Sequence, residues 1–110
     1  MNPFQWLKSC FAQGDQANTF YKRGMVKADK HNHAGAIEDY TAALNVPGVV
    51  PEMQAMILYN RGLVYVAAGM AKQGADDLNA VIQMEAAAEN VKRAAQRKLA
   101  RIQSRTKRSA

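Results

Sequence analysis

Cysteine is nearly absent from this chain, and so are long apolar runs. The 110 residues include a single cysteine, Cys10, which excludes an internal disulfide; we expect it to be a small apolar residue on a helix. This usage indicates a reducing compartment, and we expect a cytoplasmic protein. No stretch approaches the roughly 18–20 apolar residues of a membrane-spanning helix, and the N-terminus lacks the basic and apolar regions of a secretory signal.

Acidic residues are almost missing from the last quarter of the chain. Residues 86–110 contain eight Lys and Arg but only Glu89, a net charge of +7, whereas residues 1–85 carry a net charge of −1. A basic segment attracts anionic partners over a distance that salt shortens. One interpretation is a solvated helix that ends in a basic tail over 107–110. The other is a surface for nucleic acid or another anionic polymer.

What the chain does contain is a repeat with a period of 38 residues. The segment FYKRGMVKA at 20–28 returns as LYNRGLVYV at 58–66, and AIEDYTAAL at 36–44 returns as GADDLNAVI at 74–82. The identical pairs are Tyr21/Tyr59, Arg23/Arg61, Gly24/Gly62, Val26/Val64, Asp39/Asp77 and Ala42/Ala80. A fixed period of this length indicates one supersecondary unit that is copied and stacked.

The apolar residues recur at helical spacing, and nothing alternates as a strand would. The breaks are expected at Gly14, around His31, between Pro47 and Pro51, and at Gly69. About six helices are predicted, over 3–12, 16–30, 34–45, 52–68, 71–84 and 86–106. The fold class is therefore all-α, built from antiparallel helix hairpins.

Two residue pairs within each hairpin support its packing. Gly24 and Gly62 fall in mid-helix, where glycine costs about 1 kcal/mol relative to alanine, so we expect a neighbouring helix to approach closely there. Ala36 and Gly74 would supply the opposing small surface, with Tyr40 and Leu78 filling the space one turn further on. Arg23 and Arg61 recur with Asp39 and Asp77, which predicts one charged hydrogen bond in each hairpin, with a scaffold role.

These intervals between small residues, aromatic residues and alanines resemble the tetratricopeptide repeat, whose usual unit has about 34 residues. The signature positions are Gly24 or Gly62, Ala36 or Gly74, Tyr40 or Leu78, and Ala43 or Val81. The chain departs from the pattern at Lys27, where an aromatic is expected, and in four additional residues around Pro47–Pro51. The resemblance implies a short right-handed α-solenoid. Its parts are an N-terminal amphipathic helix (1–14), repeat 1 (about 17–50), repeat 2 (about 55–85) and a solvating helix (86–106), the last three forming a domain over 15–106.

The solvating helix is predicted to be an unfinished third copy. The same offset places Ala100 where Gly24 and Gly62 stand. Repeat arrays need a polar cap because an open end would expose the apolar face of the last helix. The N-terminal helix, with Phe4, Trp6, Leu7 and Phe11, is expected to cap the other end of the stack; it could instead fill the groove or lie on a membrane surface.

In this family the first helices of successive units line a concave groove that holds a peptide. The peptide-binding residues that the resemblance implies are Tyr21, Lys22, Met25, Tyr59, Asn60, Leu63, Lys98 and Arg101. Such a groove grades from aromatic and apolar to basic, which suits a peptide with an apolar anchor and acidic residues or a free carboxylate at one end. The alternative is that Tyr21, Met25, Tyr59 and Leu63 are ordinary core residues between helices.

No constellation predicts an enzyme. Asp29, His31 and His33 are too few for a closed metal site, and adjacent acidic residues on a helix point apart. We expect no catalytic residues, cofactor or metal. The prediction is a protein–protein interaction module, an adaptor or scaffold, that binds a peptide or protein segment. The alternatives are a nucleic-acid binder acting through the basic C-terminal helix, and a self-associating subunit that uses Met53, Met56, Met70 and Met84.

Overall fold

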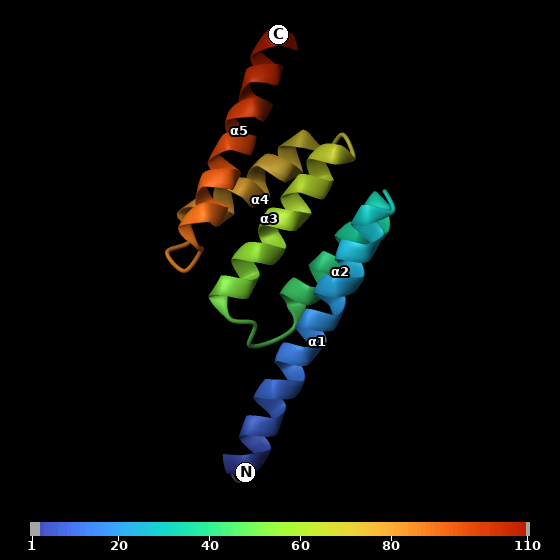
Figure 1. The fold of residues 1–110 in the computed structure, drawn as a ribbon, viewed down its shortest axis with the longest axis vertical. Coiled ribbons are helices and arrows are strands. Elements are labelled where there is room, and N and C mark those ends of the chain that lie inside the picture. Colours follow the sequence, from blue (N-terminus) through green and yellow to red (C-terminus); the bar gives the residue numbers. More distant parts are fainter. Residues whose placement is uncertain (1–2, 110) are drawn as a thin grey trace.

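Five α-helices make up nearly all of the structure, a computed structural model that describes the backbone of residues 3–109 and the side chains of residues 15–108 (Figure 1). They are α1 (Pro3–Asp29), α2 (His33–Asn45), α3 (Pro51–Ala67), α4 (Ala71–Gln83) and α5 (Glu89–Ser109). No strand occurs in this part of the chain. The prediction of an all-α fold is therefore confirmed.

The break predicted at Gly14 is wrong, and this is why the described chain has five helices rather than about six. Helix α1 runs without interruption from Pro3 to Asp29, so its first half continues beyond the end of α2 (Figure 1). Glycine weakens a helix but keeps its backbone N–H, so the hydrogen-bond ladder can pass through it. The apolar stripe predicted from Phe4 to Phe11 falls on side chains outside the described set.

The turns explain where the helices stop. His31, between α1 and α2, has a left-handed φ of 61°, and the Asn32 side chain accepts a hydrogen bond from the Gly35 N–H at 3.0 Å, capping α2. Gly69 ends α3 with a φ of 83°, as predicted. Pro51 begins α3, where its missing N–H has no helical partner to lose.

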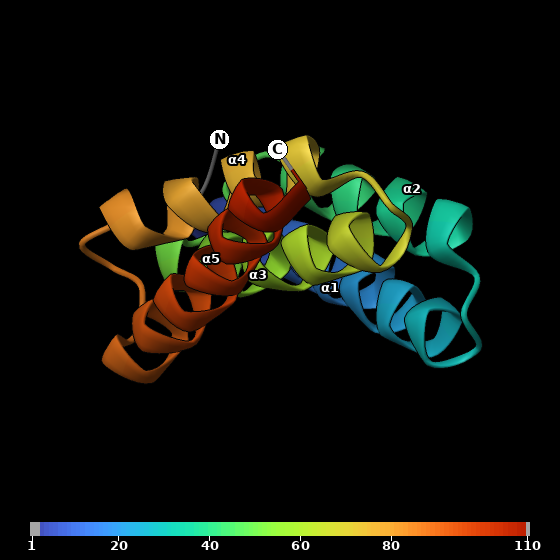
Figure 2. The ribbon, with the colours of Figure 1, turned by 90° about the horizontal axis from the view of Figure 1, so that it is seen from above.

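Each helix packs against the next one along the chain, and the loops between them are short. Figure 2 shows α2 and α4 on one side, with α1, α3 and α5 following one another on the other side. Direct contacts also join α1 to α3 and α3 to α5, whereas the described part of α1 does not contact α5. The helices are thus arranged as a row in sequence order, with extents of 59 × 30 × 18 Å.

The 38-residue period is present in the packing of the helices as well as in the amino-acid sequence. Helices α2 and α4 begin 38 residues apart, as do α3 and α5, which start at 51 and 89. Ile57 and Val64 of α3 are buried against the first hairpin, and 38 residues later Ala95 and Ile102 of α5 are buried against the second. Helix α5 therefore meets the second hairpin in the same register as α3 meets the first.

Ala100 behaves differently from the glycines that it replaces. A Cβ atom added at Gly24 would lie 2.6 Å from Cε1 of Tyr40, and one at Gly62 would lie 3.2 Å from the Gly74 carbonyl oxygen. These distances confirm the close approach predicted at both glycines. Ala100 is exposed, because no described helix packs on that side of α5.

Candidate functional site

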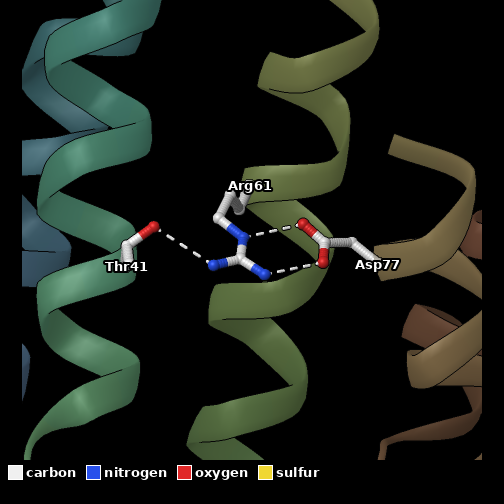
Figure 3. A network of polar contacts seen from close by, with 3 residues as sticks. All are labelled: Thr41, Arg61 and Asp77. Carbon is white, nitrogen blue, oxygen red and sulfur yellow. Dashed lines mark hydrogen bonds and ion pairs between the residues drawn. The ribbon is translucent and has the colours of Figure 1, made fainter. Parts of the chain in front are cut away.

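A three-helix polar network fixes the centre of the molecule. Arg61 donates from Nε and Nη2 to the two carboxylate oxygens of Asp77, both at 2.8 Å, and from Nη1 to Oγ1 of Thr41 at 3.1 Å (Figure 3). The guanidinium also lies 5.5 Å from the Tyr65 ring centroid. The hydrogen bonds to Asp77 raise the pKa of Arg61, although burial acts to lower it. Arg61 thus joins α2, α3 and α4, which fits the predicted scaffold role.

The equivalent pair in the first hairpin is weaker. Asp39 lies 2.9 Å from Nζ of Lys27 but 3.7 Å from Nη2 of Arg23, so Lys27 is its main partner. Lys27 occupies the position of Tyr65 one period earlier, which is why a cation reaches Asp39 from one turn further along α1. Arg23 is largely exposed and lies over the Phe20 ring at 5.6 Å. The predicted hydrogen bond from Arg23 is therefore only a long ion pair.

Two of the predicted peptide-binding residues, Tyr21 and Asn60, are hydrogen-bonded to each other. Asn60 donates from Nδ2 to the Tyr21 hydroxyl at 2.8 Å and to the Met56 carbonyl oxygen at 2.9 Å. Because both amide hydrogens are engaged, only the side-chain oxygen of Asn60 is available to a ligand. The Tyr21 ring packs 5.9 Å from that of Tyr40, and burial raises the pKa of Tyr21.

Three other predicted residues meet around a cavity of about 270 Å³. Tyr59 of α3 and Lys98 and Arg101 of α5 line it together with Ala94 and Arg97, and we call this site the cationic pocket. Among the described residues, none of the three cations here, Arg97, Lys98 and Arg101, forms an ion pair with a carboxylate. The pocket therefore combines unneutralised positive charge with one half-buried aromatic ring.

The cationic pocket continues along α5 as a basic stripe. Its members are Arg97, Lys98, Arg101, Arg105 and Arg108. Arg97, Arg101, Arg105 and Arg108 are spaced by three or four residues, which places them on one face of the helix, and Lys98 lies at the edge of that face. Arg105 also lines a second cavity, of about 310 Å³, beside the turn between α3 and α4. The stripe thus extends positive charge from Tyr59 toward the C-terminal end of α5, where it attracts anions.

The remaining predicted residues lie elsewhere. Lys22 and Met25 are exposed on α1, and Leu63 lines a cavity of about 230 Å³ with Asn60, His31, His33 and Tyr40. Desolvation, with the nearby Tyr21 and Asp29 charges, raises the pKa of Tyr40 to about 12. Apart from Tyr21, which is hydrogen-bonded to Asn60, the predicted residues thus line two cavities or form an exposed pair on α1. No group of three metal-ligating side chains occurs within the described part of the chain.

The predicted groove already grouped Tyr59 with Lys98 and Arg101, but Arg97, which also lines the cationic pocket, is not among the predicted binding residues. Tyr59 precedes Arg97 by one full period, so the two share a repeat position on successive first helices. That shared position is the signal that could have placed them together.

Comparison with known proteins adds no family to this description. No family model, no curated protein and no solved structure matches the chain. None of the helices described is long and apolar enough to cross a membrane. Function must therefore be argued from the chemistry of the site.

Proposed function

We propose that this chain is a tetratricopeptide-like right-handed α-solenoid whose α1, α3 and α5 line a concave face that binds an acidic peptide segment of a partner protein. The order of the helices, the 38-residue register and the close approach at Gly24 and Gly62 support this fold. The partner's carboxylates would bind in the cationic pocket, and its apolar residues would contact Tyr59 and the side chains beside it.

The cationic pocket is the observation that carries this proposal. Arg97 and Arg101 are exposed and Lys98 is half-buried, so their donors remain accessible to a ligand while the alkyl stems line the cavity. Arginine donates two parallel hydrogen bonds to a carboxylate, and such charged bonds are worth about 1.5–3 kcal/mol. Tyr59 adds rigid contact area at a small cost in conformational entropy.

A matched pair of charge reversals on α5 tests the proposal. Arg101 lines the pocket, whereas Arg93 is also exposed on the same helix but lies outside the pocket lining. A fluorescent peptide rich in glutamate, with one leucine and a free C-terminal carboxylate, is titrated with each variant. We expect Arg101→Glu to weaken binding roughly tenfold or more, since a charged hydrogen bond is lost. Arg93→Glu should change affinity by about threefold or less, because screening limits distant charges.

Equal losses in the two variants would show that the peptide senses only the net charge of α5, and the pocket assignment would then be wrong. Circular dichroism and urea unfolding of both variants establish that the comparison is between folded proteins.

Single-stranded nucleic acid is the second candidate, favoured by the position of Tyr59. Proteins that bind single strands combine a basic track for the backbone with aromatic rings on which bases stack. The basic stripe and Tyr59 supply both elements within one surface. A fluorescent oligothymidylate distinguishes the candidates. The logarithm of its binding constant should fall linearly with the logarithm of the salt concentration, and its affinity should drop when Tyr59 is replaced by leucine. Tighter binding of the oligonucleotide than of the acidic peptide at physiological salt would favour this second function.

A further inference from the structure

A large cavity lies on the far side of α5 from the basic stripe. It is a groove of about 590 Å³ between α4 and α5, floored by Ala71, Ala75 and Asn79 of α4 and by Leu99, Ile102 and Gln103 of α5. We call it the α4–α5 groove. Its lining is mostly apolar or neutral, unlike the cationic pocket.

The repeat explains what this groove corresponds to. One period earlier, Asn79, Leu99 and Gln103 are replaced by Thr41, Arg61 and Tyr65. Those three residues form the network of Figure 3 and the ring contact beside it, and α4 completes that network with Asp77. The groove is therefore the counterpart, at the junction of α4 and α5, of the place where α4 packs at the junction of α2 and α3.

The substitutions at this second junction change what fits there. Leu99 stands in place of Arg61, so a carboxylate equivalent to Asp77 would find no guanidinium. Ala75 stands in place of the larger Ile37, which leaves more room in the floor. A helix seated here would need an apolar side chain where α4 carries Asp77.

We propose that the α4–α5 groove binds an amphipathic α-helix of a partner protein, which packs as a sixth helix antiparallel to α5. The exposed Ala100 would meet a small residue of that helix, as Gly62 meets Gly74. Lys72 and Lys107, exposed at the rim of the groove, favour acidic residues on its flanks. A second copy of this chain is a poor occupant, because residues 86–110 carry a net charge of +7 that would face its own equivalent.

The sequence of α4 itself supplies the probe, since α4 is the helix that fits the equivalent place. Two capped peptides are compared, one with the sequence of residues 71–83 and one with the same sequence carrying Asp77→Leu. Short helices are only marginally stable in water, so binding is followed by NMR at high peptide concentration. We expect the leucine form to bind roughly tenfold more tightly, because the aspartate form would bury an unpaired carboxylate against Leu99. The amides of Ala75, Leu99 and Gln103 should shift and saturate.

Leu99→Arg should reverse this preference by restoring the partner of Asp77, while Asn90→Arg, which adds the same charge at an exposed position outside the groove, should leave it unchanged.

Four results would overturn the proposal. They are no saturable shifts in the groove, shifts centred on Tyr59 and Lys98 instead, an unchanged preference in a folded Leu99→Arg variant, and groove shifts that depend on protein concentration without peptide. The last would make a second copy the occupant. None of them decides whether the cationic pocket binds acidic peptides, because that pocket has its own variants.

Discussion

Replacing Asp77 by alanine should cost much more stability than replacing Asp39, although the two residues occupy equivalent positions in the repeat. Asp77 is 6% exposed and Asp39 is 4% exposed, so burial alone predicts no difference. The partners differ. The side chain of Arg61 is 18% exposed and makes two hydrogen bonds to Asp77, whereas the side chains of Lys27 and Arg23 are 33% and 56% exposed.

The expected magnitudes follow from what each substitution leaves behind. Breaking a buried ion pair costs about 3–5 kcal/mol, which we reduce to about 2–4 kcal/mol for Asp77→Ala because Arg61 keeps some contact with water and its bond to Thr41. Exposed ion pairs contribute about 1 kcal/mol or less, so Asp39→Ala should cost on the order of 1 kcal/mol as Lys27 rehydrates.

Urea unfolding followed by circular dichroism measures both free energies. The double variant Arg61→Ala/Asp77→Ala should cost less than the sum of its single variants, because each single change already breaks the same pair. If Asp39→Ala proves as destabilising as Asp77→Ala, the network of Figure 3 does not stabilise the fold in the way that we infer.

Three further predictions concern the packing at Gly74, the buried Tyr40 and the predicted peptide-binding residue Asn60. Gly74→Ala should lower the free energy of unfolding in urea by about 1 kcal/mol, because an added Cβ would lie 2.9 Å from the Gly62 carbonyl oxygen and this overpacking outweighs the gain in helix propensity. Replacing the exposed Gln73 by alanine should leave stability unchanged, and a stabilising Gly74→Ala would contradict the close approach of the two helices. Because the pKa of Tyr40 is raised from 10.0 to about 12 in the folded protein, the unfolded chain ionises first and stability should fall as pH rises between these values; Tyr40→Phe should reduce that fall, and an equally steep fall would exclude this cause. Asn60→Ala should lower the free energy of unfolding by about 1 kcal/mol, because the hydrogen bond to Tyr21 is lost, and it should weaken acidic-peptide binding less than Arg101→Glu does. A larger loss of affinity in Asn60→Ala than in Arg101→Glu would show that Asn60 binds the peptide directly.

The period of the repeat made most of the fold predictable. Gly24 and Gly62 are poor helix residues that recur at one position, and a recurring cost of that kind indicates a contact that both hairpins share. For the same reason the bounds of α2, α3 and α4 differ from the predicted ones by one residue at most. Local pattern and tertiary packing agree at these positions.

The features that the sequence missed depend on competition between local and distant contacts. Gly14 looks like a helix end, but only its low propensity argues for a break, and α1 passes through it. Asp39 has two cations within reach, and their distances, rather than the recurrence of Arg23, decide which one binds.

The geometry of the cationic pocket could not be predicted from the sequence either. Tyr59 and the cations of α5 come together through the packing of α3 on α5, which depends on the tilt between successive units. The sequence predicts the members of the pocket but not that tilt. It likewise could not show that Tyr21 and Asn60 satisfy each other.

The most direct measurement is an NMR titration of the isotope-labelled chain with the glutamate-rich peptide. The proposed function predicts saturable shifts at Tyr59, Ala94, Lys98 and neighbouring amides, while the amides of α2 stay in place. Shifts spread evenly over all the basic residues, or confined to α2 and α4, would contradict binding in the cationic pocket.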